Sequence, residues 1–286
     1  MLKAAETILR VTEKENISIV QAILKLSSTD TGVSEAEIRK RMHGRLLAIF
    51  ESVEDAAANT EPLKFGQIPE LNFGGDALSG EFILYASKTA IQVSKHNATM
   101  GRVVAAPTAG SCGILPGIFS AWKTLRAGED WEEQLTDALI VAGAIGEVIA
   151  KRATLAGAEG GCQAECGAAS AMGSAALAFL RGGSCETCLH AAALTIKSLL
   201  GLACDPVGGI VECPCIKRNG MLVANAILAA DLALAGVRSL IPLDEVIDTM
   251  KEIGQMLPPA IRETSLGGLA QTPSGIALTK KLHEGE

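Results

Sequence analysis

Residues 160–180 read Gly160-Gly161-Cys162-Gln163-Ala164-Glu165 and then continue without a charged side chain from Cys166 to Leu180. The uncharged run has 15 residues, fewer than the roughly 20 that a helix needs to span a bilayer. It therefore predicts a helix buried in a protein core. Hydrophobic residues make up 48% of the chain and aromatic residues only 3%, so the core must consist of small and aliphatic side chains. Because small side chains let helices approach closely, we predict an all-α fold.

The chain has 286 residues, more than the usual ~100 to 200 residues of a domain. No proline-rich, serine-rich or charged linker divides it, so we expect a single helical catalytic domain over residues 1–286. Residues 1–60 are expected to form an N-terminal helical portion. The turn-rich segment Glu61–Gly75 is expected to join this portion to the rest of the chain.

Two helix starts and one tail can be predicted from local patterns. Ser34 and Glu37 stand at the spacing of a capping box, which predicts a helix that begins there. Asp130 is expected to cap a helix that begins at Trp131. The charged tail, Leu278–Glu286, is expected to fray.

The net charge of −7 disfavours a nucleic-acid partner, because its phosphates would be repelled. The N-terminal residues lack the basic flank and apolar core of a secretory signal, and we expect a cytoplasmic protein with no membrane span. In that reducing compartment, disulfides explain the eight cysteines poorly. Metal binding, catalysis or simple burial as small hydrophobic side chains explains them better.

Three of these cysteines lie in separate motifs of the central stretch: Gly161-Cys162-Gln163, Ala203-Cys204-Asp205 and Pro214-Cys215-Ile216. They are 42 and 11 residues apart, unlike the short runs of ferredoxins or the close pairs of structural zinc sites. Three thiolates on an iron–sulfur cubane would leave one iron free to act as a Lewis acid. An iron–sulfur centre is our hypothesis, and a helical scaffold with structural zinc is the alternative. The CxxC of Cys185 and Cys188 has no second CxxC nearby, which favours packing residues.

A further candidate site is the segment Pro107-Thr108-Ala109-Gly110-Ser111, which precedes a helix expected to begin at Ile114. Backbone N–H groups at a helix start, with hydroxyls beside them, can bind a carboxylate. The same pattern suits a glycine-rich helix start that serves close packing alone. Spacing leaves both interpretations open.

Six motifs together resemble the α subunit of iron–sulfur-dependent L-serine dehydratase, in order and at compatible spacing over nearly the whole chain. They are Leu78-Ser79-Gly80, Pro107-Thr108-Ala109-Gly110-Ser111, Gly161-Cys162-Gln163-Ala164-Glu165, Leu202-Ala203-Cys204-Asp205-Pro206-Val207, Pro214-Cys215-Ile216-Lys217-Arg218-Asn219 and Arg262-Glu263-Thr264. The resemblance implies a 4Fe-4S cluster bound by Cys162, Cys204 and Cys215. Three other cysteines, Cys112, Cys166 and Cys213, do not match ligands of the family.

The resemblance also implies a reaction, the conversion of L-serine into pyruvate and ammonia without pyridoxal phosphate. The open iron would act as a Lewis acid for loss of the hydroxyl. Substrate contacts are implied at Asn97, at the segment 107–111 and at Asp205. The base is not assigned, but Glu165, three residues after Cys162, is a candidate for the base or for a supporting partner.

Two other enzymes stay open as alternatives. A related iron–sulfur lyase could act on L-threonine or L-cysteine, because these differ from serine by a methyl group or one atom. A pyridoxal-phosphate enzyme could use Lys88 or Lys95, near Gly110 in sequence, but no α/β sheet is predicted. Single-chain relatives carry an additional N-terminal domain, which two-subunit members have as a separate β chain. Since this sequence lacks that domain, we expect a serine dehydratase β subunit as its partner in a heterodimer.

Overall fold

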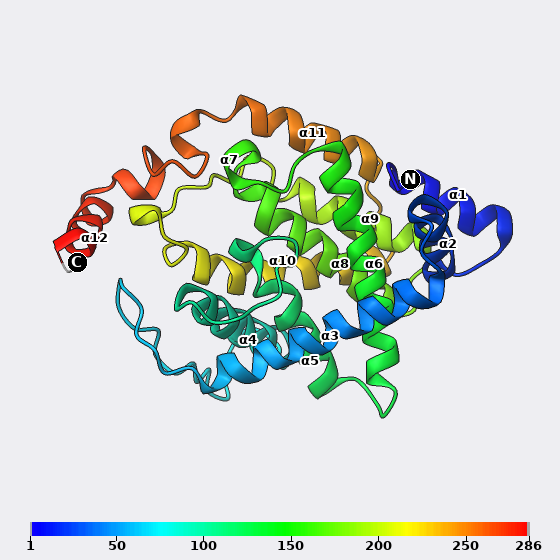
Figure 1. Ribbon diagram of the computed structural model, residues 1–286, viewed down its shortest axis with the longest axis horizontal. Helices are drawn as coiled ribbons and strands as arrows, with labels where there is room; N and C mark the ends of the chain where they lie inside the picture. Colours follow the sequence, from blue (N-terminus) through cyan, green and yellow to red (C-terminus); the bar gives the residue numbers. More distant parts are fainter. Residues whose placement is uncertain (1, 285–286) are drawn as a thin grey trace.

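The computed structural model describes residues 2–284, and within this range it contains α-helices and short helical turns but no β-strand. The predicted all-α fold is confirmed (Figure 1). The α-helices are α1 (Ala5–Glu15), α2 (Ile19–Thr31), α3 (Glu35–Ala58), α4 (Glu81–Ala98), α5 (Ile114–Leu125), α6 (Trp131–Arg152), α7 (Gly157–Gly160), α8 (Ala168–Leu180), α9 (Cys185–Lys197), α10 (Cys215–Leu234), α11 (Leu243–Met256) and α12 (Pro273–Glu284). The short turns are η1 (Ala109–Ser111), η2 (Gln163–Gly167), η3 (Val207–Gly209), η4 (Pro259–Ile261) and η5 (Gly268–Gln271).

The centre of the fold is α8, which comes from the uncharged run and packs against α5, α6, α9 and α10 (Figure 1). Its residues from Ala168 to Ala178 are all buried. Glycine permits the closest approach, because a Cβ added at Gly173 would lie 2.5 Å from Ile118 Cδ1 of α5. The same holds at Gly117 of α5, where an added Cβ would lie 2.4 Å from the Ala86 carbonyl oxygen of α4. The small-residue composition thus allows these helices to pack closely.

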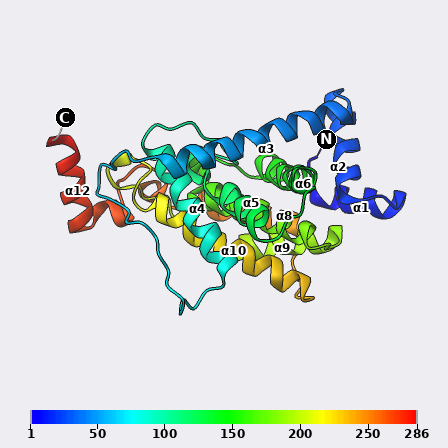
Figure 2. The same cartoon turned by 90° about the horizontal axis from the view of Figure 1, so that it is seen from below.

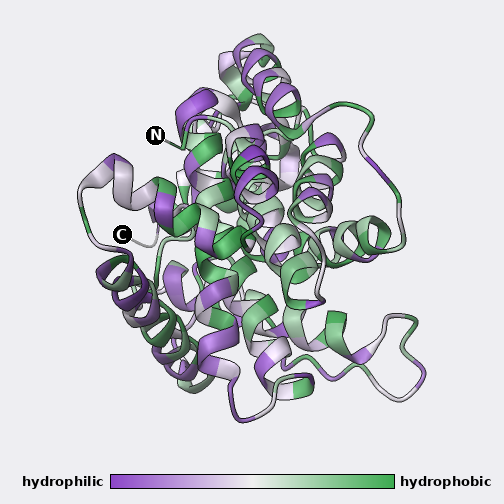
Figure 3. Cartoon of the chain, turned by 90° about the vertical axis from the view of Figure 1, so that its right-hand side faces the viewer, coloured by the Kyte–Doolittle hydropathy of each residue, from purple (hydrophilic) through white to green (hydrophobic). Residues whose placement is uncertain are grey.

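The N-terminal helices α1, α2 and α3 contribute to the same main hydrophobic core as α4, α5, α6, α8, α9, α10 and α11. Helix α3 extends over α4 and α6 (Figure 2). Asp244 of α11 accepts hydrogen bonds from Ala5 N at 2.8 Å and Glu6 N at 3.1 Å, and so caps the start of α1 from a distant part of the sequence. Purple and green segments alternate along the outermost helices, as expected where one face meets water (Figure 3).

The predicted loop after α3 is present, since residues 59–80 contain no helix. It bows away from the body of the molecule (Figure 2). The part of the loop around Lys64 and Phe65 is held by Glu212, whose carboxylate accepts hydrogen bonds from Lys64 N at 2.7 Å and Phe65 N at 2.9 Å. Of the helices within residues 2–284, none is long and apolar enough to cross a membrane.

Three local predictions need correction. Asp130 makes no side-chain cap for α6, because its carboxylate accepts from the Gln134 side chain at 2.8 Å. Ser34 does cap α3, but Glu37 does not complete the capping box and binds Arg41 at 2.8 Å instead.

The tail is the third correction. It forms α12 up to Glu284 rather than a frayed end, while residues 285 and 286 lie outside the described part, as residue 1 does. Leu282 of α12 contacts the turn around Gly208, where an added Cβ would lie 3.1 Å from Leu282 Cδ2. This tertiary contact stabilises a helix that its local sequence alone does not predict.

Candidate active site and metal centre

The structure brings Cys162, Cys204 and Cys215 together from three parts of the chain. Cys162 directly precedes the π-helical turn η2, Cys204 lies in the loop after α9, and Cys215 is the first residue of α10. Burial and then the charge of Cys162 raise the pKa of Cys204 above its ordinary value, and the same two causes raise that of Cys215 to about 12. Cys204 and Cys215 are therefore both close enough to Cys162 to be affected by its charge. Thiols in this environment ionise readily only beside a compensating cation, such as a metal ion.

The backbone around Cys162 is fixed by neighbouring buried groups. Gly161 has φ +75°, a left-handed conformation that glycine adopts without strain. An added Cβ there would lie 2.8 Å from the Leu202 carbonyl oxygen. The Gln163 side chain, 1% exposed, donates to Met250 O at 2.8 Å and accepts from Gly201 N at 2.9 Å. The first bond ties the π-helical turn to α11 and the second ties it to the loop that carries Cys204. Such π-helical turns are frequent at functional sites.

A half-buried cation lies beside Cys162. Arg218, on the first turn of α10, donates to Ala203 O at 2.8 Å and to Asp205 Oδ1 at 3.2 Å. Although burial opposes it, the charges of Cys162 and Asp205 raise the pKa of Arg218. A hydrogen bond with Cys166 and the charge of Arg218 lower the pKa of Cys162. Arg218 thus stabilises the thiolate form of Cys162.

Asp205, a predicted substrate contact, forms hydrogen bonds with other residues of the chain. Its Oδ1 accepts from Arg218, and its Oδ2 accepts from Leu269 N at 2.8 Å. The residue is 6% exposed. This geometry makes Asp205 a support for Arg218 and for the loop around Leu269.

The segment 107–111 lies beside Glu165. Thr108 Oγ1 donates to Glu165 Oε1 at 2.9 Å, and Asn97 Nδ2 of α4 donates to Ala109 O at 3.2 Å. Burial and then the charge of Glu263 raise the pKa of Glu165, while the hydrogen bonds from Thr108 and Cys204 oppose this shift. Pro107, Thr108 and Gly110 are half-buried and Ala109 is exposed, whereas Ser111 is fully buried.

The backbone N–H groups at the start of α5 were expected to be free to bind a carboxylate, but most of them donate hydrogen bonds to other residues of the chain. Ser111 N donates to Thr108 O and Cys112 N to Ala109 O, both at 3.3 Å. Gly113 N donates to Asn219 Oδ1 at 3.1 Å. A ligand would therefore meet the earlier part of the segment, residues 107–110, rather than the N–H groups nearest α5.

Asn219 joins this segment to α10. It has no exposed surface, and its Nδ2 donates to Gly110 O at 2.8 Å and to Cys215 O at 3.0 Å. Together with the hydrogen bond that it accepts from Gly113 N, the Asn219 side chain holds the segment 107–113 against the first turn of α10. The sequence motif Pro214–Asn219 contains this residue, but nothing in its spacing indicates the contact.

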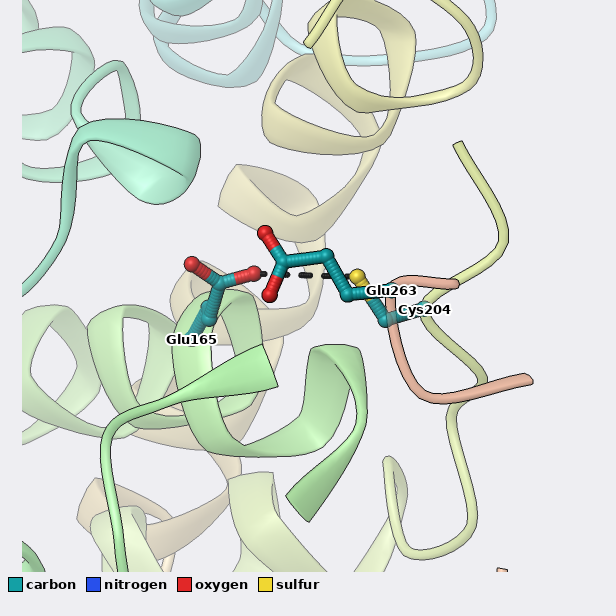
Figure 4. Close-up of side chains that lie close together, drawn as sticks. All are labelled: Glu165, Cys204 and Glu263. Carbon is teal, nitrogen blue, oxygen red and sulfur yellow. Dashed lines mark hydrogen bonds between the residues drawn. The ribbon is translucent and has the colours of Figure 1, made fainter. Parts of the chain in front are cut away.

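Glu263 is a site residue that the sequence reasoning missed, although it lies in the motif Arg262-Glu263-Thr264. Its backbone N donates to Cys204 O at 2.7 Å, and Cys204 N donates to Ile261 O at 2.9 Å. Ligand atoms of Glu165, Cys204 and Glu263 all lie within 4.8 Å of one another (Figure 4). Two carboxylates therefore flank one of the three thiols.

Four other cysteines are packed in the interior, namely Cys112, Cys166, Cys185 and Cys188. Cys112 and Cys185 are buried, and burial raises their pKa values to about 12 and about 11. Burial also raises that of Cys188. Cys166 borders the site, with its Sγ 3.7 Å from Gly110 O, and its hydrogen bond with Cys162 and its burial raise its pKa.

The donor set fits an iron–sulfur cluster better than a structural zinc ion. Iron–sulfur clusters are held by cysteine thiolates, and three converge here. Gly157 leaves room beside Glu165 and Cys204, because an added Cβ there would lie 2.7 Å from Glu165 Oε2 and 3.2 Å from Cys204 Sγ. Structural zinc usually takes four thiolate or imidazole ligands, whereas the most compact ligand group among residues 2–284 has two carboxylates and one thiol.

An all-α fold that brings two buried thiols and one half-buried thiol beside carboxylates and a hydroxyl is the arrangement expected of a helical metalloenzyme. The chain belongs to the serine dehydratase alpha chain family, whose model, described as "Serine dehydratase alpha chain", matches residues 14–270. It is 41% identical to the probable L-serine dehydratase, alpha chain, of Bacillus subtilis strain 168, over 100% of this chain and 96% of that protein. It is also 41% identical to the L-serine dehydratase, alpha chain, of Peptoniphilus asaccharolyticus, over 100% of both chains.

A longer relative shows a different chain organisation. The L-serine dehydratase of Streptomyces coelicolor is 45% identical over 68% of this chain, but the match covers only 42% of that protein. The resemblance expected from the six motifs is thus confirmed at the level of the family.

Proposed function

We propose that this protein deaminates L-serine to pyruvate and ammonia. The observation that carries the proposal is the convergence of Cys162, Cys204 and Cys215 beside Glu165 in a member of the serine dehydratase alpha chain family. The proposed centre is a 4Fe-4S cluster held by these three thiolates. When bound, such a cluster supplies a Lewis acid that favours departure of the substrate hydroxyl.

The chain's own residues prepare the thiolates. Arg218 offsets the charge of Cys162, and its contacts with Ala203 O and Asp205 keep it in place. Gln163 and Ile261 hold the backbone at Cys162 and Cys204. The site is thus held by residues outside the cysteines, which reduces the reorganisation needed when a ligand binds.

Glu165 is the proposed proton acceptor for the substrate Cα. Its carboxylate is largely removed from water and is oriented by the Thr108 hydroxyl. Burial raises the pKa of this carboxyl group, and an acid with a higher pKa gives a stronger conjugate base. The segment 107–110 is the proposed seat of the substrate carboxylate, since it lies next to Glu165: an added Cβ at Gly110 would lie 3.0 Å from Oε1.

Loss of the Cα proton and of the hydroxyl leaves 2-aminoacrylate, which tautomerises to an imine that water hydrolyses to pyruvate and ammonia. In the balance, the hydroxyl leaves with one proton as water, and a water molecule is consumed in the hydrolysis. The protein therefore needs one base, an oriented carboxylate seat and a route for water. A separate β subunit is the proposed partner, and the cytoplasm is the proposed compartment.

The test is an anaerobic assay of the reconstituted chain, alone and with its proposed β subunit, on L-serine, L-threonine and L-cysteine. We expect pyruvate and ammonia from L-serine at a higher kcat/KM than either competitor gives. A preference for L-threonine or L-cysteine would contradict the proposed substrate. Zinc in place of iron and sulfide in active material would contradict the proposed centre.

A further inference from the structure

The side chain of Glu263 lies near the Cys204 thiol, and within residues 2–284 its carboxylate has no partner of its own. The loop that carries it is fastened to the Cys204 loop by the pair of backbone bonds described above and by Ser265 Oγ, which donates to Pro206 O at 2.6 Å. Glu263 and Ser265 have positive φ angles of 65° and 57°. This backbone places the Glu263 carboxylate opposite that of Glu165 (Figure 4).

Among the described residues, the Glu263 carboxylate has no hydrogen-bond or ion-pair partner, although Arg262 precedes it in the chain and Arg218 lies beside Cys162. Arg218 is engaged with Ala203 O and Asp205. Arg262 donates to Glu159 O at 3.5 Å. Two carboxylates at this separation repel one another, and a positive group between them would relieve the repulsion.

We propose that Glu263 binds the α-ammonium group of the amino-acid substrate, an inference that rests on the proposed function. An amino acid presents a carboxylate, an ammonium group and a side-chain hydroxyl from adjacent carbons. When the substrate carboxylate binds at residues 107–110, the substrate Cα lies beside the Glu165 carboxylate. The substrate ammonium group then lies between Glu165 and Glu263. An ammonium group has three N–H donors, enough to bond both carboxylates.

This arrangement gives Glu263 a specific role in substrate selection. A carboxylate facing an ammonium group favours amino acids over carboxylic acids that lack the nitrogen, because the acid without nitrogen leaves the two carboxylates unpaired. Glu263 is exposed at the outer edge of the site. It is therefore accessible to an incoming substrate, whereas Glu165 lies deeper.

The test compares L-alanine with propanoate, two acids that lack a hydroxyl leaving group and differ in the ammonium group. Their dissociation constants are measured by anaerobic calorimetry on the reconstituted full chain and on Glu263→Gln. We expect the wild-type protein to prefer L-alanine, and Glu263→Gln to reduce this preference by roughly 10- to 100-fold, the range of a hydrogen bond to a charged group. The KM for L-serine should rise by a similar factor, with a smaller change in kcat.

Glu252→Gln is the matched control, because it removes the same charge from an exposed position on α11. It should leave the preference and the iron content unchanged. The proposal is overturned if Glu263→Gln weakens L-alanine and propanoate equally, if it leaves both unchanged, or if it reduces the iron content. Loaded wild-type protein that prefers L-alanine but releases no pyruvate from L-serine would instead contradict the proposed function.

Discussion

Thr108 Oγ1 lies 2.9 Å from Glu165 Oε1 and donates a hydrogen bond to it. The two residues come from different motifs, one before α5 and one in η2, and the bond fixes the carboxylate beside Cys204. Glu165 Oε2 lies 3.9 Å from the Cys204 thiol. The hydroxyl of Thr108 therefore orients the proposed base with respect to one of the proposed cluster ligands.

Replacing Thr108 with valine keeps the shape of the side chain and removes the hydroxyl. A hydrogen bond to a charged group contributes about 1.5–3 kcal/mol, so we expect kcat/KM for L-serine to fall by roughly 10- to 100-fold. Thr108→Ser keeps the hydroxyl and should retain most of the activity. Equal losses in both variants would show that the methyl group, and not the hydrogen bond, is important.

Gly157 provides the space beside the thiols. Alanine at this position would place a Cβ 2.7 Å from Glu165 Oε2 and force the carboxylate to move. Because a displacement of about 1 Å can lower a rate about 100-fold, we expect Gly157→Ala to lose most serine deaminase activity. Its unfolding free energy should change little, since the contacted atoms are at the ends of side chains.

The control for this variant is Gly44→Ala in α3, where an added Cβ meets nothing within 4 Å. Alanine in a helix is favoured over glycine by about 0.5–1 kcal/mol, so Gly44→Ala should be as active as the wild-type protein and slightly more stable. Full activity of Gly157→Ala would contradict the placement of Glu165.

Asn219→Ala tests the link between the segment 107–113 and α10. The substitution leaves Gly113 N without its partner and leaves Gly110 O with only the weak hydrogen bond from the Cys166 thiol, and an unpaired buried group costs about 1–3 kcal/mol. We expect a matching loss in the unfolding free energy of the protein without iron, measured by urea denaturation. Asn225→Ala on the same helix removes a buried side-chain oxygen that has no hydrogen bond among the described residues, and it should be nearly neutral.

The sequence predicts those parts of the molecule that depend on local pattern or on the chemistry of single residues. The uncharged run identifies the central helix α8, and the turn-rich segment after residue 60 identifies the long loop. The three cysteines stand out because thiolate is a specialised ligand. The resemblance of their motifs to the family implies the proposed cluster, but their spacing does not show how the loops meet.

Contacts between distant segments could not be predicted in this way. Glu263 reaches the site because the backbone at Arg262 pairs with Cys204 in an isolated β-bridge. No periodicity in the sequence predicts such a pairing. Arg218 becomes a partner of Cys162 only when α10 packs against the turn η2. Asp130 fits the pattern of a helix cap, but the competing side chain of Gln134 accounts for its actual contact.

The central claim is that Cys162, Cys204 and Cys215 hold one iron–sulfur cluster. The most direct test is to measure iron and acid-labile sulfide in protein purified anaerobically, for the wild type and for the alanine variant of each cysteine. Cys213→Ala is the control, because Cys213 is two residues from Cys215 and equally half-buried, but does not match a ligand of the family. We predict about four iron and four sulfide atoms per chain in the wild type and in Cys213→Ala, as a 4Fe-4S cluster requires, with cluster loss in the other three variants. Wild-type protein without iron, or an intact cluster after replacement of any of the three, would contradict the claim.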